Sequence, residues 1–158
     1  MEQKNIGRYV GILNRQFQAY INISLKDIDI SFSEYIFLVN LYDNEGINQE
    51  ELSSMLFIDK AATARAIKLL EKKGFLKRET CEKDKRAKNL YLTDKGKDYK
   101  EFIYSRLEKW TDFTTKGMDK ETIDIVMNGL QFIGERAANA NFDDLSEPKK
   151  DNKAYSKK

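Results

Sequence analysis

Two closely spaced helix starts limit what this 158-residue chain can fold into more than any other feature. Asn48 can cap a short helix over residues 49–56, because its side-chain oxygen can accept from the free N–H groups of a first turn. Asp59 can cap a longer helix over residues 60–73 in the same way. Gly74 then stands where helices favour a glycine stop. The pattern predicts two helices joined by a tight turn.

A short hairpin is predicted directly after this pair of helices. Residues 75–81 and 87–92 have β-forming character and flank a polar turn at residues 82–86. A two-stranded hairpin in this position is the wing of a winged helix-turn-helix. We therefore expect a mainly α fold of this class.

Longer amphipathic helices are predicted on both sides of this module. Apolar residues recur at helical spacing over residues 5–26 and over two further helices within residues 94–141. Their unmet apolar stripes suggest a dimer base, although an ordinary core remains an alternative for the first of them. We expect one domain over residues 1–142, with the winged helix at about 31–93, and a flexible, Lys-rich tail over residues 143–158.

The 60–73 helix is predicted to have two different faces. Residues at core spacing form its inner stripe: Thr63, Ala66, Ile67 and Leu70. Small and basic residues form the outer face: Lys60, Ala61, Ala64, Arg65, Lys68 and Lys72. Small side chains let a helix enter a major groove about 12 Å wide, and Arg65 and Lys68 can reach base edges or phosphates. An ordinary surface helix is the alternative.

The charge distribution agrees with a polyanion partner. Residues 48–100 carry a net charge of +5, whereas the rest of the chain carries −3. A solvated charged face would give the same numbers. Basic residues also cluster at the predicted hairpin tip, where Lys85 and Arg86 stand beside Asp84. An arginine there can enter a narrow minor groove, and Asp84 can brace it. A solvated tip is the alternative.

Composition argues against an enzyme. The chain has no His, and its single Cys81 excludes an internal disulfide and any CxxC pair. We therefore expect no catalytic residue, no metal site and no cofactor. No apolar run approaches the ~18–20 residues that span a bilayer, so we expect a cytoplasmic protein without a membrane partner.

Several short segments of the chain occur in a characteristic order: Glu51-Leu52, Leu70-Glu71-Lys72-Lys73-Gly74-Phe75, Arg78, Asp84-Lys85-Arg86 and Leu92-Thr93-Asp94-Lys95-Gly96. With these segments the chain resembles the MarR family of transcriptional regulators over about residues 6–140. The resemblance implies a winged-helix homodimer that binds a near-palindromic duplex DNA operator. It also implies a repressor that a small, often phenolic, ligand releases from DNA.

The resemblance assigns roles to residues by position. The DNA-binding residues it implies are Lys60, Ala61, Ala62, Thr63, Ala64, Arg65, Lys68, Lys85 and Arg86, with Asp84 as the brace of the wing. Thr63 departs from this set because its spacing places it on the inner stripe. Phe17, Tyr35 and Phe102 are candidate lining residues of the pocket for a small aromatic effector, with plain core packing as the alternative. A winged-helix protein–protein adaptor without DNA binding remains the second functional hypothesis.

Overall fold

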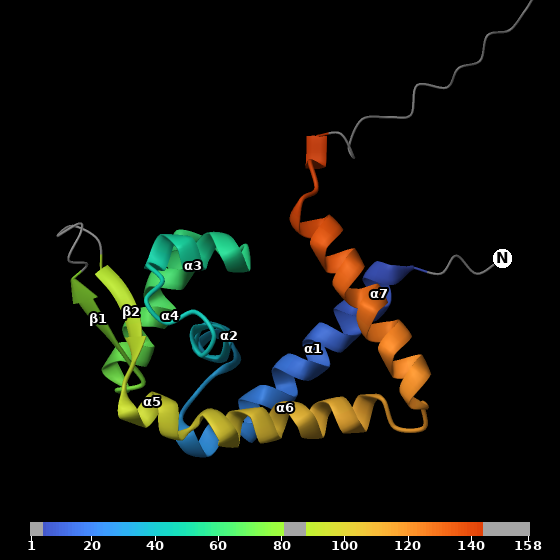
Figure 1. Cartoon of the computed structure of the whole chain (residues 1–158), viewed down its shortest axis with the longest axis horizontal. Helices are drawn as coiled ribbons and strands as arrows, with labels where there is room; N and C mark the ends of the chain where they lie inside the picture. Colours follow the sequence, from blue (N-terminus) through green and yellow to red (C-terminus); the bar gives the residue numbers. More distant parts are fainter. Residues whose placement is uncertain (1–4, 81–87, 144–158) are drawn as a thin grey trace, which may run out of the picture. The chain divides into compact units, whose positions relative to one another are not determined.

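The computed structural model describes residues 5–80 and 88–143 (Figure 1). The predicted mainly α fold with a small hairpin is confirmed. In chain order the elements are α1 (Ile6–Ser24), the 3₁₀ turn η1 (Lys26–Ile28), α2 (Phe32–Leu41), α3 (Gln49–Leu56), α4 (Lys60–Lys72), β1 (Leu76–Thr80), β2 (Lys88–Leu92), α5 (Asp94–Asp98), α6 (Lys100–Thr114) and α7 (Lys120–Ala138). The chain separates into two compact units, residues 1–116 and 117–158, and each is described by itself.

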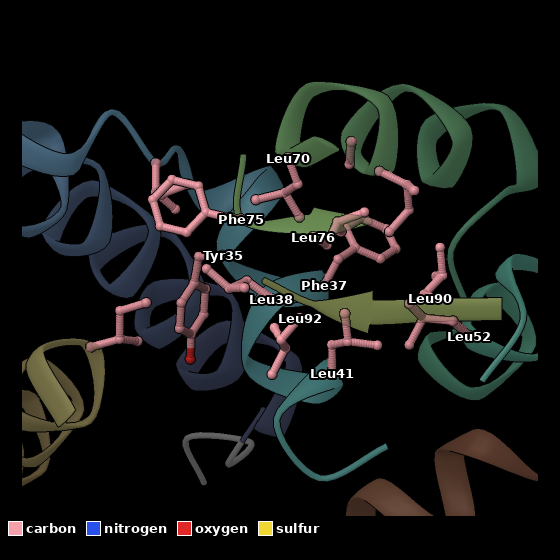
Figure 2. Packing of buried hydrophobic residues seen from close by; sticks show 14 of the residues in the cluster. Tyr35, Phe37, Leu38, Leu41, Leu52, Leu70, Phe75, Leu76, Leu90 and Leu92 are labelled. Carbon is pink, nitrogen blue, oxygen red and sulfur yellow. The ribbon is translucent and has the colours of Figure 1, made fainter. Parts of the chain in front are cut away.

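Helix α2 forms the centre of the first unit. It contacts α1, α4 and β2, and its residues Phe37, Leu38 and Leu41 are at most 2% exposed. Figure 2 shows these side chains together with leucines from α3, α4 and both strands. Full burial of one such side chain stabilises a fold by about 1.5–3 kcal/mol. This cluster therefore holds α2, α3, α4 and the hairpin together. Helix α2 is therefore the central support of the winged helix.

Side-chain caps start α3 and α5, and the cap of α3, Asn48, is the one predicted from the sequence. Asn48 Oδ1 accepts from the N–H groups of Glu50 and Glu51, both at 2.9 Å, and the Glu51 carboxylate accepts from the Asn48 N–H at 3.1 Å. The Thr93 hydroxyl accepts from the Gly96 N–H at 3.1 Å. These bonds satisfy N–H groups that have no partner within their own helix.

The hairpin is antiparallel, and its register runs from Leu76 opposite Leu92 to Thr80 opposite Lys88. The loop before α3 pairs with β2 through an isolated antiparallel bridge, Asn48 opposite Asn89, which was not predicted from the sequence. Leu90 donates to the Ile47 carbonyl at 2.9 Å and accepts from the Gly46 N–H at 2.8 Å. The start of α3 is thereby fixed to the base of the hairpin.

The first of the two helices expected within residues 94–141 is divided in the structure. The helix is interrupted at Tyr99, where ψ is −2°, and α6 begins at Lys100. The Tyr99 ring packs against Phe75 at 5.6 Å and Phe102 at 6.2 Å between ring centroids. This aromatic packing holds Tyr99 at the junction of α5 and α6.

The first unit exposes apolar side chains along α1. Tyr9 is 60% exposed, and Ile6, Val10 and Leu13 are also exposed. The other end of α1 packs on α6, where the Tyr20 hydroxyl donates to the Arg106 carbonyl at 2.9 Å. One end of α1 is therefore packed, and the apolar side chains at its other end are exposed among the described residues.

The second unit contains α7, which Asp119 caps by accepting from the Thr122 N–H at 2.9 Å. This helix also exposes large apolar residues, namely Ile125, Val126, Met127, Leu130, Phe132 and Ile133. Within the described residues, no helix combines the length and apolar character needed to cross a membrane.

Candidate nucleic-acid interface

Both ends of α4 are fixed by local hydrogen bonds. Asp59 Oδ1 accepts from the Ala62 N–H at 2.8 Å, which is the N-cap that the sequence predicted. At the other end Gly74 has φ of +78°, a conformation that side-chain-bearing residues rarely adopt. The Phe75 N–H then donates back to the Leu70 carbonyl at 2.9 Å. These contacts define where α4 begins and where it ends.

The two predicted faces of α4 are present. The inner stripe of Thr63, Ala66, Ile67 and Leu70 is buried. On the opposite side, the exposed residues are Lys60, Ala61, Arg65, Lys68 and Lys72, with Ala62 and Ala64 half-buried at the edges. Because alanines stand near its N-terminal end, the outer face of α4 can approach another surface closely.

Thr63 needs a correction as a candidate DNA contact. Its side chain is 0% exposed, and its hydroxyl donates to the Asp59 carbonyl at 3.0 Å. A side chain enclosed in this way packs the helix against the core and cannot reach a ligand outside. The helical spacing had already placed Thr63 on the inner stripe.

The junction between α3 and α4 is held by bonds across the turn. The Ser53 hydroxyl donates to the Ile58 carbonyl at 2.7 Å, and the Ile58 N–H donates to the Ser53 carbonyl at 3.1 Å. Lys60 at the start of α4 forms an ion pair with Glu50 of α3. The hydrogen bond from Lys60 lowers the pKa of the Glu50 carboxyl below its usual value.

The basic residues of α4 differ in whether an acidic side chain already neutralises them. The charge of Lys60 is already partly neutralised by Glu50. Among the described residues, no ion pair involves Arg65, Lys68 or Lys72. These three are therefore the cations of the outer face that are most available to an anionic partner, and Arg65 and Lys68 lie nearer its alanine-rich N-terminal end.

The base of the hairpin is connected to both helices by Arg78. Its Nη2 donates to Gln49 Oε1 at 3.5 Å, and its Nε lies 3.7 Å from Glu71 Oε2. Arg78 therefore links β1 to the start of α3 and to the last turn of α4. The predicted residues at the hairpin tip, Asp84, Lys85 and Arg86, lie outside the described residues, as does Cys81, and their roles stay predictions.

The sequence matches known regulators over most of its length. The MarR family pattern matches residues 30–88. The HTH-type transcriptional regulator YybA of Bacillus subtilis (strain 168) is 35% identical over 135 residues, which cover 84% of this chain and 90% of that protein. The chain belongs to the MarR family. It is accordingly a helix-turn-helix transcriptional regulator.

Solved structures of MarR-family proteins agree with the fold. A MarR transcriptional regulator from Methanosarcina mazei Go1 has a TM-score of 0.82 and 34% identity, with 85% of this chain and 96% of that chain covered. A MarR-family regulator from Listeria monocytogenes, solved in complex with a 26mer DNA, has a TM-score of 0.82 and 31% identity. That match covers 87% of this chain and 91% of the Listeria chain. The helix-turn-helix and wing described above are thus those of a MarR-family winged helix.

Two of the three candidate effector-pocket residues of this MarR-family protein lie together. Phe17 of α1 packs edge-on against Tyr35 of α2, with ring centroids 5.8 Å apart, and lies 5.4 Å from the Trp110 ring of α6. Burial, together with the nearby Tyr104, raises the pKa of the Tyr35 hydroxyl to about 12. Trp110 was not among the candidate residues, although a lone tryptophan on an amphipathic helix is a signal for such a cluster.

Phe102, the third candidate, packs in a different way. Its ring contacts Tyr99 and lies 4.5 Å from the guanidinium carbon of Arg106. A separate groove of about 460 Å³ runs between α2 and α4, and none of the three candidates belongs to its lining: Phe32, Ser33, Ile36, Phe37, Ile58, Ala62, Arg65, Ala66 and Leu69. Arg65 thus borders both this groove and the outer face of α4.

Proposed function

We propose that this MarR-family regulator is a homodimeric repressor that binds near-palindromic duplex DNA through the outer face of α4. The observation that carries the proposal is the exposed Arg65 and Lys68, which form no ion pair with any described residue, on a helix whose leading residues are alanines. Arginine can hydrogen-bond a guanine edge in two places, and lysine can neutralise a phosphate. The 26mer DNA bound to the Listeria relative supports a duplex ligand.

The wing would complete this contact. We propose that Arg86 enters the minor groove, that Lys85 contacts the backbone, and that Asp84 orients Arg86. On α4 itself, Ala61, Ala62 and Ala64 would allow close approach, and Lys60 would contribute less because it is paired with Glu50.

The dimer would place two copies of α4 one helical turn of DNA apart, roughly 34 Å. Exposed apolar residues on α1 and on α7, such as Val10 and Leu130, support an interface made by both terminal helices. Residues 1–142 would then act as one module in the dimer. A cytoplasmic location agrees with contact to the genome.

A small aromatic effector would release the repressor from DNA. Phe17 and Tyr35 are the candidate contacts, since their rings already meet and the Tyr35 hydroxyl stays protonated at neutral pH, where it can donate a hydrogen bond. Phe102 would contribute from α6. Our proposal includes no cofactor, no metal and no catalytic step.

Binding to duplex DNA across a range of salt concentrations tests the proposal. We expect log affinity to fall linearly with log salt, because phosphate contacts release counterions. The double variant Arg65→Ala/Lys68→Ala should bind at least about tenfold more weakly at moderate salt. Lys109→Ala is the matched control, since Lys109 is an exposed lysine of α6.

The same experiment separates the alternatives. Absence of duplex binding at low salt would contradict the proposal and favour the protein–protein adaptor. Equal affinity of the double variant and the wild type would show that the outer face of α4 is not the contact.

A further inference from the structure

Lys73 connects the end of α4 to the segment that precedes α2. Its Nζ lies 2.7 Å from Glu34 Oε1 and 3.4 Å from Asp29 Oδ2, and it also donates to the Asp29 carbonyl. Lys73 is the C-cap residue of α4, and Asp29 and Glu34 lie on either side of the α2 N-cap. One ammonium group therefore joins two segments that are distant in sequence.

Glu34 is the buried partner of this ion pair. It is 1% exposed, and its other oxygen, Oε2, accepts from the Ser31 N–H at 2.9 Å and from the Ser31 hydroxyl at 2.6 Å. The Lys73 ammonium meets Oε1 as an ion pair outside hydrogen-bond angles. A buried carboxylate without a countercharge is strongly unfavourable, so Glu34 confines Lys73 to this position.

A third contact ties the same point to α5. Lys95 Nζ donates to the Lys73 carbonyl at 2.8 Å and lies 4.4 Å from the centroid of the Phe75 ring. Helix α5 leads directly into α6, and Asp29 follows α1 through the turn η1. The end of α4 is therefore bonded to both connections that lead toward the long flanking helices α1 and α6.

We propose that Lys73 is a positioning residue whose ion pair with Glu34 fixes α4 relative to α1 and α6, and so sets the spacing of the two α4 helices in the dimer. The inference rests on the proposed function, since spacing matters only for a dimer that binds two half-sites. Because these bonds hold its C-terminal end, α4 keeps one orientation relative to α1 and α6. The two α4 helices of the dimer can then enter major grooves that lie one helical turn apart.

The test compares duplex binding by the wild type with binding by a variant in which uncharged residues replace both Glu34 and Lys73. Glu34→Gln/Lys73→Met leaves no buried charge uncompensated, and the side-chain amide introduced at position 34 keeps a carbonyl that can accept from Ser31. The control Glu45→Gln/Lys97→Met neutralises a pair, 3.6 Å apart, that joins the loop before α3 to α5. Each protein is titrated with three duplexes: a selected operator, the same operator with one base pair inserted between its half-sites, and a single half-site.

Wild type and control should prefer the operator over the inserted duplex by about tenfold or more, because coupling between two binding sites typically changes affinity by roughly 5–150-fold. The double variant should lose most of that preference but keep its affinity for the half-site. Lys95→Met replaces an exposed residue and should also reduce the preference for the operator over the inserted duplex. This variant provides the test if the double variant does not fold.

Three results would overturn the inference. A double variant with lower thermal stability but an unchanged spacing preference would mean that the ion pair only stabilises the fold. An equal loss of affinity on all three duplexes would mean that the pair affects DNA contact rather than spacing. A wild-type protein that binds no duplex would overturn the proposed function, and the inference with it, whereas the first two results leave the proposed function standing.

Discussion

Gly96 lies so close to Phe75 that a Cβ atom at position 96 would stand 2.1 Å from the Phe75 carbonyl oxygen. Helix α5 can therefore begin beside the hairpin only if this position has no side chain. Thr93 and Gly96 belong to the segment Leu92-Thr93-Asp94-Lys95-Gly96, and the close approach of the Phe75 backbone explains why its last residue is a glycine.

Gly96→Ala should destabilise the protein. The added methyl group must displace the backbone near Phe75, and overpacking of this kind typically costs about 1–3 kcal/mol. Urea unfolding measures the change. Gly129→Ala is the matched control, because a Cβ there would meet no described atom within 4 Å outside its own stretch of helix backbone, and alanine favours a helix. Equal effects of the two substitutions would contradict the argument.

Asp59→Ala should lower stability by about 1 kcal/mol, because the Ala62 N–H loses its acceptor. Asp59→Asn should retain most of the stability, since asparagine caps a helix about as well as aspartate. Thermal unfolding of the three proteins distinguishes these outcomes. If Asp59→Asn falls as far as Asp59→Ala, the carboxylate acts through its charge and not as a cap.

Phe57→Gly should stabilise the protein. Phe57 has φ of 55° and is 71% exposed, so it occupies a left-handed conformation with little packing to compensate. Glycine adopts this conformation without strain, so the substitution should raise the free energy of unfolding by about 1 kcal/mol. Phe57→Ala keeps the backbone strain and should show no such gain. A glycine variant less stable than the alanine variant would mean that the Phe57 side chain packs favourably.

Tyr35 should make the protein less stable in strong base. Burial raises the pKa of its hydroxyl to about 12 in the folded chain, against 10.0 when unperturbed. As pH rises from 10 to 12, the unfolded chain loses the proton first, so the stability due to Tyr35 is lost over this window, on the order of 1–2 kcal/mol. Urea unfolding of the wild type and Tyr35→Phe across this range measures the difference. If both proteins lose stability in parallel, Tyr35 is not the cause.

Local features of the fold were predictable because neighbouring residues determine them. The caps at Asn48, Asp59 and Thr93 depend on side chains within three residues, and the inner stripe of α4 follows from its periodicity. The resemblance to the MarR family added the homodimer, the DNA operator and the roles of individual residues, which local patterns alone do not decide.

Contacts between distant segments were not predictable in this way. The pairing of Lys73 with Glu34 and the hydrogen bonds of Ile47 to β2 depend on how elements pack, and neither has a local signature. The same reason explains why Thr63 was included by position among the DNA contacts although it is buried. Position in a family motif shows which element carries a residue, while burial decides what its side chain can reach.

Selection of bound sequences from a random duplex pool, with wild type and Arg65→Ala side by side, tests the central claim most directly. If the outer face of α4 reads DNA, the wild type should enrich a near-palindromic sequence, and Arg65→Ala should change the preferred base at symmetric positions in each half-site. Lys68→Ala would separate a phosphate contact, which weakens binding uniformly, from a base contact. Identical selected sequences for wild type and Arg65→Ala, or no enrichment by the wild type, would contradict the claim.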